Sequence, residues 1–122
     1  MSNRAPTATR TPAEVGRANR RAGRELERAA QVALEGAGWF VLRTGAGQAG
    51  VVDLVGLCPS TALRRAEKWF VQCKVNGYLP PAERGKLAEL AERYMGHAVV
   101  ATWEKPAKGP RHVTFRNLED ET

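Results

Sequence analysis

A single carboxylate interrupts an apolar run of the sequence, and it constrains the fold more than any other residue. The run is GVVDLVGLCP, residues 50–59, in which Asp53 follows two valines and precedes a leucine and a valine. A carboxylate in a buried strand loses its water, which is costly unless a partner compensates. A second strand-like run, KWFVQCKV at 68–75, carries Gln72 and Lys74 through similarly apolar surroundings. We therefore look for a pairing of the two runs that brings Asp53, Gln72 and Lys74 together.

The two strand candidates, 51–57 and 68–74, lie symmetrically about position 62.5. If they pair as an antiparallel hairpin about that centre, Asp53 lies opposite Gln72. Opposed residues share a face with Cβ atoms about 4.5–5.5 Å apart, although the loop does not fix the register and a one-residue slip would exchange the faces. One face is predicted to hold Val51, Asp53, Val55, Phe70, Gln72 and Lys74, and the other Val52, Leu54, Trp69, Val71 and Cys73.

The rest of the chain alternates helix and strand signals. A capping box, TPAE at 11–14, opens a helix that we expect to be firm only from Arg20 or Arg21, because Gly16 and Gly23 weaken it. Further strands are expected at 39–43, 98–103 and 112–116, and a second helix between Pro80 and Gly96. This order predicts an α/β fold in which helices flank one mixed five-stranded sheet.

Positive charge is concentrated at the start of the chain. The net charge is +6, and residues 1–24 contain six arginines against Glu14 alone. Such a segment is typical either of a solvated tail or of a protein that binds nucleic acid. We expect a disordered basic arm over 1–15, a folded domain over 16–118 and a frayed acidic tail over 119–122.

Several classes of protein are disfavoured by the sequence. No run approaches the roughly 18 apolar residues of a membrane span, and no secretory signal is visible, so no membrane partner is expected. Cys58 and Cys73 lack metal-ligand spacing. We therefore expect free thiols and a cytoplasmic protein (in the host cytoplasm if viral). The loop TGAGQAG at 44–50 lacks the Lys-Ser/Thr ending of a P-loop, which argues against a nucleotide cofactor.

The polar residues on the predicted sheet face allow two interpretations. One is a buried ion pair between Asp53 and Lys74 with Gln72 as a hydrogen-bonding filler, although desolvation makes such pairs poor stabilisers. The other is a metal site, because carboxylate and amide oxygens suit Mg²⁺, which also accepts phosphate oxygens as ligands. In that case Lys74 would orient the attacking water or stabilise charge developing on a phosphate.

Asp53 followed by the QCK of the next strand resembles the PD-(D/E)xK nuclease motif. The surrounding residues resemble the archaeal Holliday-junction resolvase branch, the Hjc-like enzymes. The likeness runs from about Gly23 to Phe115 and also includes the segments FVLRTGAG and GKLAELAERYMG. The chain departs from the family pattern in the neutral Gln72, where Glu is usual, and in Thr44, where the family loop often has Ser.

The resemblance implies a restriction-endonuclease-like fold and a Mg²⁺-dependent endodeoxyribonuclease, with Mn²⁺ as a substitute, that resolves four-way (Holliday) junctions by paired nicks. It implies that Glu27, Asp53 and the side-chain oxygen of Gln72 bind the metal, with the Cys73 carbonyl as a further ligand. Lys74 would act on the water. The residues assigned to DNA are Arg20, Arg21, Arg24, Arg28, Arg43 and Thr44.

The family also implies a homodimer, since resolving a junction takes two nicks related by a two-fold axis. Leu90 and Tyr94 match positions of dimer contact in the family, and the alternative is that both pack on the sheet of their own chain. Two other functions stay open: an inactive DNA-binding module of the same fold, because Gln72 is neutral, and a nuclease that acts on another DNA structure.

Overall fold

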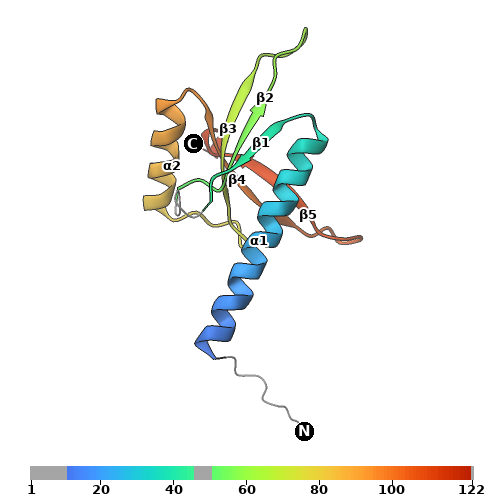
Figure 1. Ribbon diagram of the computed structural model, residues 1–122, viewed down its shortest axis with the longest axis vertical. Coiled ribbons are helices and arrows are strands. Elements are labelled where there is room, and N and C mark those ends of the chain that lie inside the picture. Colours follow the sequence, from blue (N-terminus) through green and yellow to red (C-terminus); the bar gives the residue numbers. More distant parts are fainter. Residues whose placement is uncertain (1–10, 46–50, 122) are drawn as a thin grey trace.

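The structure is a computed structural model that describes residues 11–45 and 51–121. Its five strands form one sheet in the order β1-β2-β3-β4-β5, in which only β3 and β4 are parallel neighbours (Figure 1). The strands are β1 (Phe40–Arg43), β2 (Leu54–Cys58), β3 (Glu67–Cys73), β4 (His97–Glu104) and β5 (His112–Asn117). The helices are α1 (Pro12–Gly36), α2 (Pro81–Arg93) and a short 3₁₀ helix, η3 (Leu118–Glu121). The expected α/β architecture is confirmed.

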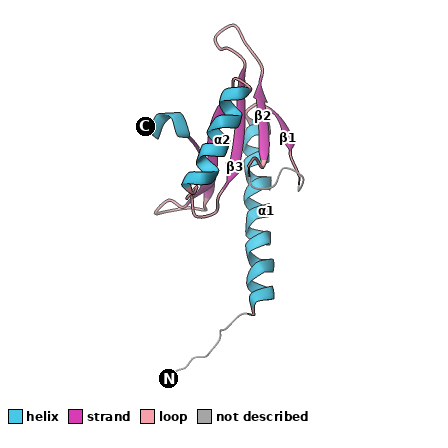
Figure 2. Ribbon diagram, turned by 90° about the vertical axis from the view of Figure 1, so that its left-hand side faces the viewer, coloured by secondary structure: helices cyan, strands magenta, loops and turns pink. Residues whose placement is uncertain are grey.

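The two long helices cover opposite faces of the sheet (Figure 2). On the α1 face, Ala30 packs with Leu54, Val71 and the centre of β4. On the α2 face, Leu87 packs in a cluster with Phe70 and other buried residues. Each face of the sheet therefore has its own apolar core.

The predicted pairing of the two motif strands is confirmed. Leu54 lies opposite Val71 and Val55 lies opposite Phe70, which is the register of the symmetric hairpin. The strand β2 begins only at Leu54, so that Asp53 lies one residue before the paired region. The carboxylate is thus at the end of the sheet rather than within it.

The predicted face of Val52 is wrong. Val52 packs in the α2-side cluster, whereas Leu54 packs on the α1 side. The prediction extended strand alternation back to residue 51, but the chain is irregular before Leu54. Alternation holds only within a strand, because it follows from the pleat.

Helix α1 begins earlier than the sequence predicts. It starts at Pro12, where both hydrogen bonds of the capping box between Thr11 and Glu14 are formed. The cap satisfies backbone donors at the helix end and offsets the two glycines, so residues 12–15 are helical and not part of a disordered arm. Residues 1–10 of the predicted arm lie outside the described residues. No helix in the described part of the chain is long and apolar enough to cross a membrane.

The acidic C-terminal residues are more ordered than expected. Residues 118–121 form η3, and Leu118 is buried in the α2-side core. Glu121 accepts a hydrogen bond from Arg84 at 2.9 Å and also pairs with Arg116. The prediction of a frayed tail is wrong for 119–121 because the acidic side chains have cationic partners on the domain.

Candidate active site

Asp53 is joined to the QCK segment by direct backbone contacts. Its Oδ2 accepts a hydrogen bond from the amide of Cys73 at 2.8 Å. Its own amide donates to the carbonyl of Val71, also at 2.8 Å. The carboxylate therefore lies against the end of β3, beside the peptide between Gln72 and Cys73. The chain order and the register together bring the three motif residues to one end of the sheet.

Thr44 holds the segment that carries Asp53. Its amide donates to the Asp53 carbonyl at 3.2 Å, and its hydroxyl donates to the carbonyl of Val52. These bonds satisfy backbone carbonyls that no strand pairs, since β2 starts one residue later. The structure thus gives Thr44 a positioning role that the sequence did not predict, while its assignment to DNA stays a prediction.

Glu27 and Arg43 meet at the same end of the sheet. Arg43 Nη2 donates to Glu27 Oε1 at 2.9 Å, which links the end of β1 to α1. Both side chains are partly exposed. The sequence predicts a metal ligand at Glu27 and a phosphate contact at Arg43, and the structure pairs these two residues with each other.

The carboxyl of Asp53 is perturbed by its surroundings. Burial raises its pKa above the ordinary value of 3.8, and the hydrogen bond from the Cys73 amide opposes that rise. The negative charge of Glu27 raises the pKa further, while Lys74 and Arg43 lower it. Glu27, Lys74 and Arg43 therefore each lie within electrostatic range of Asp53. A perturbed acid of this kind is common in functional sites.

The thiol of Cys73 is not an activated nucleophile. Burial raises its pKa, and the charges of Asp53 and Glu27 raise it further. A thiol is nucleophilic only as the thiolate, so this side chain stays inert near neutral pH. Cys73 contributes its backbone amide to the site, and its carbonyl as a metal ligand remains a prediction.

Gln72 is the one buried polar residue of the described core, with 6% of its surface exposed. Its Oε1 is buried and has no hydrogen-bond partner. An unpaired buried acceptor is costly, so this oxygen is suited to a ligand such as a cation. This amide oxygen and the carboxylates of Asp53 and Glu27 are hard oxygen donors, the type that suits Mg²⁺ or Mn²⁺. Among the described residues, His, Cys, Asp and Glu form no group of three or more that could hold a metal ion.

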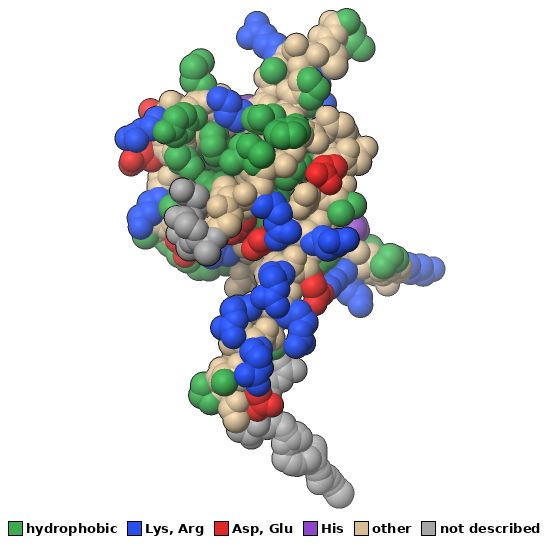
Figure 3. All heavy atoms as spheres, viewed as in Figure 1, with side chains coloured by type: hydrophobic (Ala, Val, Ile, Leu, Met, Phe, Trp, Pro, Cys, Tyr) green, Lys and Arg blue, Asp and Glu red, His purple; other side chains and the backbone are tan. Residues whose placement is uncertain are grey.

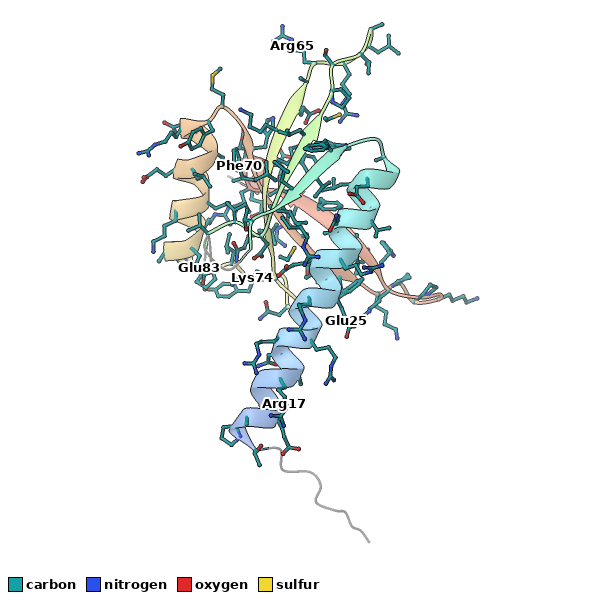
Figure 4. All side chains as sticks on the ribbon, in the orientation of Figure 1. Arg17, Glu25, Arg65, Phe70, Lys74 and Glu83 are labelled. Atoms are coloured by element: carbon teal, nitrogen blue, oxygen red, sulfur yellow. The ribbon has the colours of Figure 1, made fainter. Side chains whose placement is uncertain are left out.

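Lys74 lies just beyond the end of β3 and pairs with a residue that the sequence did not single out. Its Nζ is 2.9 Å from Oε1 of Glu83, in the first turn of α2 (Figure 4). No strand pattern relates the two, because one follows a strand and the other opens a helix. The only sequence signal was an acidic residue soon after Pro80 and Pro81.

A row of arginines runs along α1 on the side away from the sheet. At 100° per residue they fall within an arc of about 100°, opposite the buried residues Leu26, Ala30 and Leu34. The row is Arg17, Arg20, Arg21, Arg24 and Arg28, and we call it the arginine stripe. In the described part of the chain none of the five forms an ion pair. Figure 3 shows their blue side chains along the part of α1 that projects beyond the sheet.

The two residues predicted at a dimer contact differ in exposure. Leu90 is half-buried and packs against the α2-side core. Tyr94 is 51% exposed, and its ring lies 6.2 Å from that of Phe70. The alternative interpretation, packing on the chain's own sheet, therefore describes Leu90 better than Tyr94.

Comparison with known proteins gives a likeness among solved structures. No protein-family model matches the sequence, and no curated protein matches it. Among solved structures the fold is similar to that of Hjc, a Holliday junction resolvase from the archaeal hyperthermophile Archaeoglobus fulgidus. The TM-score is 0.59 at 21% identity, over 80% of this chain and 73% of that chain. The two proteins share a fold, as the resemblance of the motifs predicts.

Proposed function

We propose that this protein is a metal-dependent endonuclease that cuts branched DNA, with the four-way junction as its substrate. The observation that carries the proposal is the hydrogen bond between Asp53 and the Cys73 amide. This bond brings the carboxylate to the QCK segment in a fold shared with a junction resolvase. Carboxylate, amide oxygen and lysine at one strand end can bind a hard cation and act on a phosphodiester.

The metal would be held by Asp53, Glu27 and Gln72, with the Cys73 carbonyl as a further ligand. When bound, a divalent ion supplies Lewis-acid activation of the phosphate and of the attacking water. Lys74 keeps its ammonium at the site to orient the water and to stabilise charge that develops on the phosphate. The proposed hydrolysis uses no covalent intermediate, because the water itself attacks the phosphate.

DNA binding is supported by the distribution of charge. The arginine stripe has no carboxylate partners in the described residues and carries like charges three and four residues apart, which destabilises an isolated helix. A polyanion would remove that repulsion. Arg28 and Arg43 lie at the end of the stripe nearest Glu27, where they would hold the phosphate to be cut. DNA thus explains a charge pattern that costs the free protein stability.

Paired nicks in a four-way junction require two sites, and we propose that a homodimer provides them. Apolar side chains are exposed near the C-terminal end of α2, with Tyr94 51%, Met95 90% and Phe40 62% exposed. Phe40 and Met95 line one hollow of about 580 Å³ together with Leu57. Exposed apolar surface of this kind is suited to pairing with a second copy.

The test is cleavage of a synthetic four-way junction beside a linear duplex and a flap of the same sequence, in Mg²⁺, in Mn²⁺ and in EDTA. The expected result is metal-dependent nicking of the junction at a rate well above that of the duplex. Replacement of Asp53 or Lys74 by Ala should abolish cutting and leave junction binding largely intact. Equal rates on all three substrates would leave a nuclease without junction preference.

A second candidate, supported by Gln72, is a DNA-binding module that has lost its chemistry. The neutral side chain removes one negative ligand, which weakens the attraction for a cation. Its signature would be tight binding of the junction with no cleavage in any divalent metal at any enzyme concentration.

A further inference from the structure

We infer that Glu83, in the first turn of α2, is a positioning residue for Lys74. The inference rests on the proposed function and extends it to a residue outside the PD-(D/E)xK pattern. It predicts that the site extends beyond the end of β3 to the first turn of α2.

The geometry of the pair carries the inference. Glu83 Oε1 is 2.9 Å from Lys74 Nζ, and both side chains are mostly shielded, with 26% of Lys74 and 32% of Glu83 exposed. Figure 4 shows the two labelled side chains close together between the sheet and α2. Partial burial reduces screening by water and salt, so this pair is more strongly coupled than an exposed ion pair.

Lys74 has no acidic partner in β3, the strand that it follows. Gln72, two residues earlier, is neutral, and its Oε1 has no hydrogen-bond partner. A lysine ammonium is a compact charge on a flexible stem, which needs an anchor to keep one position. Glu83 is the only acidic side chain that forms an ion pair with it among the described residues.

The helix that carries Glu83 is fixed to the sheet. Leu87 and Ala91 of α2 are buried in the core with Phe70 of β3. The link between Lys74 and the helix is also fixed, because the Gly77 amide donates to the Lys74 carbonyl at 2.9 Å and the Gly77 carbonyl accepts from Arg116 at 2.9 Å. A carboxylate on such a support can hold a side chain to the precision that catalysis requires.

The ion pair leaves the ammonium free to act. An ammonium has three donors, and one is directed at Glu83, so two remain for a water molecule and a phosphate oxygen. Lys74 follows the end of β3, whose last residue, Cys73, donates its amide to Asp53, whereas Glu83 lies on α2. We therefore assign Glu83 to the orientation of Lys74 and not to the metal.

The first test follows the amine itself and needs no cleavage. The rate of acetylation of Lys74 by an amine-reactive ester is measured by mass spectrometry in the metal-free protein. Glu83→Gln should raise that rate several-fold, because the amine is released. The matched control is Glu89→Gln, which removes the same charge from an exposed position of the same helix that has no partner among the described residues. That control should leave the rate unchanged.

The second test separates positioning from binding. In single-turnover cleavage of the junction, Glu83→Gln should lower the maximal rate about 10- to 100-fold, the usual effect of removing a supporting residue. The half-saturating DNA concentration should stay constant, and Mg²⁺ affinity measured by calorimetry should also be unchanged. Glu83→Asp keeps the charge and should recover part of the rate, whereas Glu89→Gln should cleave like wild type.

Two results would overturn the inference: unchanged acetylation of Lys74 in Glu83→Gln, or cleavage by Glu83→Gln as fast as by Glu89→Gln. A failure of the proposed function looks different, since wild-type protein would then cut no DNA. In that case the acetylation experiment still decides whether Glu83 holds Lys74.

Discussion

The guanidinium of Arg43 lies 2.9 Å from the carboxylate of Glu27, so a proposed phosphate-binding residue neutralises a proposed metal ligand. Both side chains are accessible to solvent, and exposed pairs of this kind contribute about 0–1 kcal/mol to stability. A cation that binds Glu27 competes with Arg43 for the carboxylate, and displacing Arg43 is not costly. Displacement would free the guanidinium for a phosphate, so metal binding and DNA binding favour the same rearrangement.

Replacement of Arg43 by Gln should change metal affinity and cleavage in opposite directions. Without the guanidinium, Glu27 has no competing partner and the local positive charge falls, so Mg²⁺ should bind several-fold more tightly. The phosphate no longer has this cation to bind it, and junction cleavage should fall about tenfold or more. Calorimetry with Mg²⁺ and single-turnover cleavage measure the two effects. The control is Arg64→Gln, which breaks a similar exposed pair at the far hairpin. Weaker metal binding in Arg43→Gln would contradict the competition.

Replacement of Asp53 by Asn should stabilise the metal-free protein near neutral pH. Burial raises the folded-state pKa of Asp53 above 3.8, so the folded state holds this proton more tightly than the unfolded state does. The resulting stability is present below pH 3.8 and is lost as pH rises through the raised pKa.

The Asn variant has no charge to bury, and removing an unfavourable group at a functional site commonly stabilises a protein by about 0.5–2 kcal/mol. Urea unfolding in EDTA between about pH 3 and pH 8 checks the effect. The advantage of Asn over Asp should be small at the acid end and should grow with pH. An Asn variant that is less stable than wild type near neutral pH would show that the buried charge of Asp53 does not destabilise the folded protein.

The register of the two motif strands was predictable because it follows from a local symmetry of polar and apolar residues. The pairing of Leu54 with Val71 and of Val55 with Phe70 is what a hairpin centred between the runs requires. The same reasoning failed at Val52, because alternation cannot indicate where a strand begins.

Contacts between elements that are distant in the chain could not be predicted from the sequence. The ion pair of Lys74 and Glu83 depends on how α2 docks on the sheet, which no period of residues encodes. The order at Glu121 depends on Arg84 and Arg116, which come together only in the folded chain. The capping box of α1 was visible in the sequence, but its strength relative to the two helix glycines was not.

Replacement of Gln72 by Glu should strengthen metal binding and lower the thermal stability of the metal-free protein. A buried carboxylate without a partner is costly, so the melting temperature in EDTA should fall. A cation gains one more negative ligand, and the attraction between this added charge and a bound ion is at least about 1 kcal/mol. The Mg²⁺ affinity should therefore rise about tenfold or more. Thermal melts with and without Mg²⁺ should therefore show a larger metal-induced shift in Gln72→Glu than in wild type. Equal shifts would place residue 72 outside the metal site.

Neutralising part of the arginine stripe should reduce the salt dependence of DNA binding. Removing one arginine that binds a phosphate lowers the slope of log K against log salt by about 0.9 on duplex DNA. Arg20→Ala combined with Arg24→Ala should thus lower the slope by about 1.8. The helix should remain folded, because Ala favours helix and the like-charge repulsion is reduced. The control removes two cations from α2, Lys86 and Arg93, and should leave the slope near that of wild type. Equal slopes in both variants would mean that the stripe does not follow the phosphate backbone.

A charge at Tyr94 should separate the proposed dimer into monomers. This ring is half exposed at the end of α2, near the exposed Met95 and Phe40, whereas Leu90 is partly engaged in the chain's own core. Tyr94→Glu should therefore disrupt pairing with little damage to the domain, and the matched control is Val32→Glu, at a similarly exposed apolar residue of α1. Light scattering at micromolar concentration should report a monomer for Tyr94→Glu and a dimer for the control.

The same pair of variants tests whether two sites act together. On a supercoiled plasmid that extrudes a junction, wild type and Val32→Glu should cut both strands within the lifetime of one complex and release linear DNA. Tyr94→Glu should accumulate nicked circles, because each monomer carries one site. A wild-type protein that is monomeric and yields only nicked circles would refute paired resolution, and the same fold would then be a single-strand nickase.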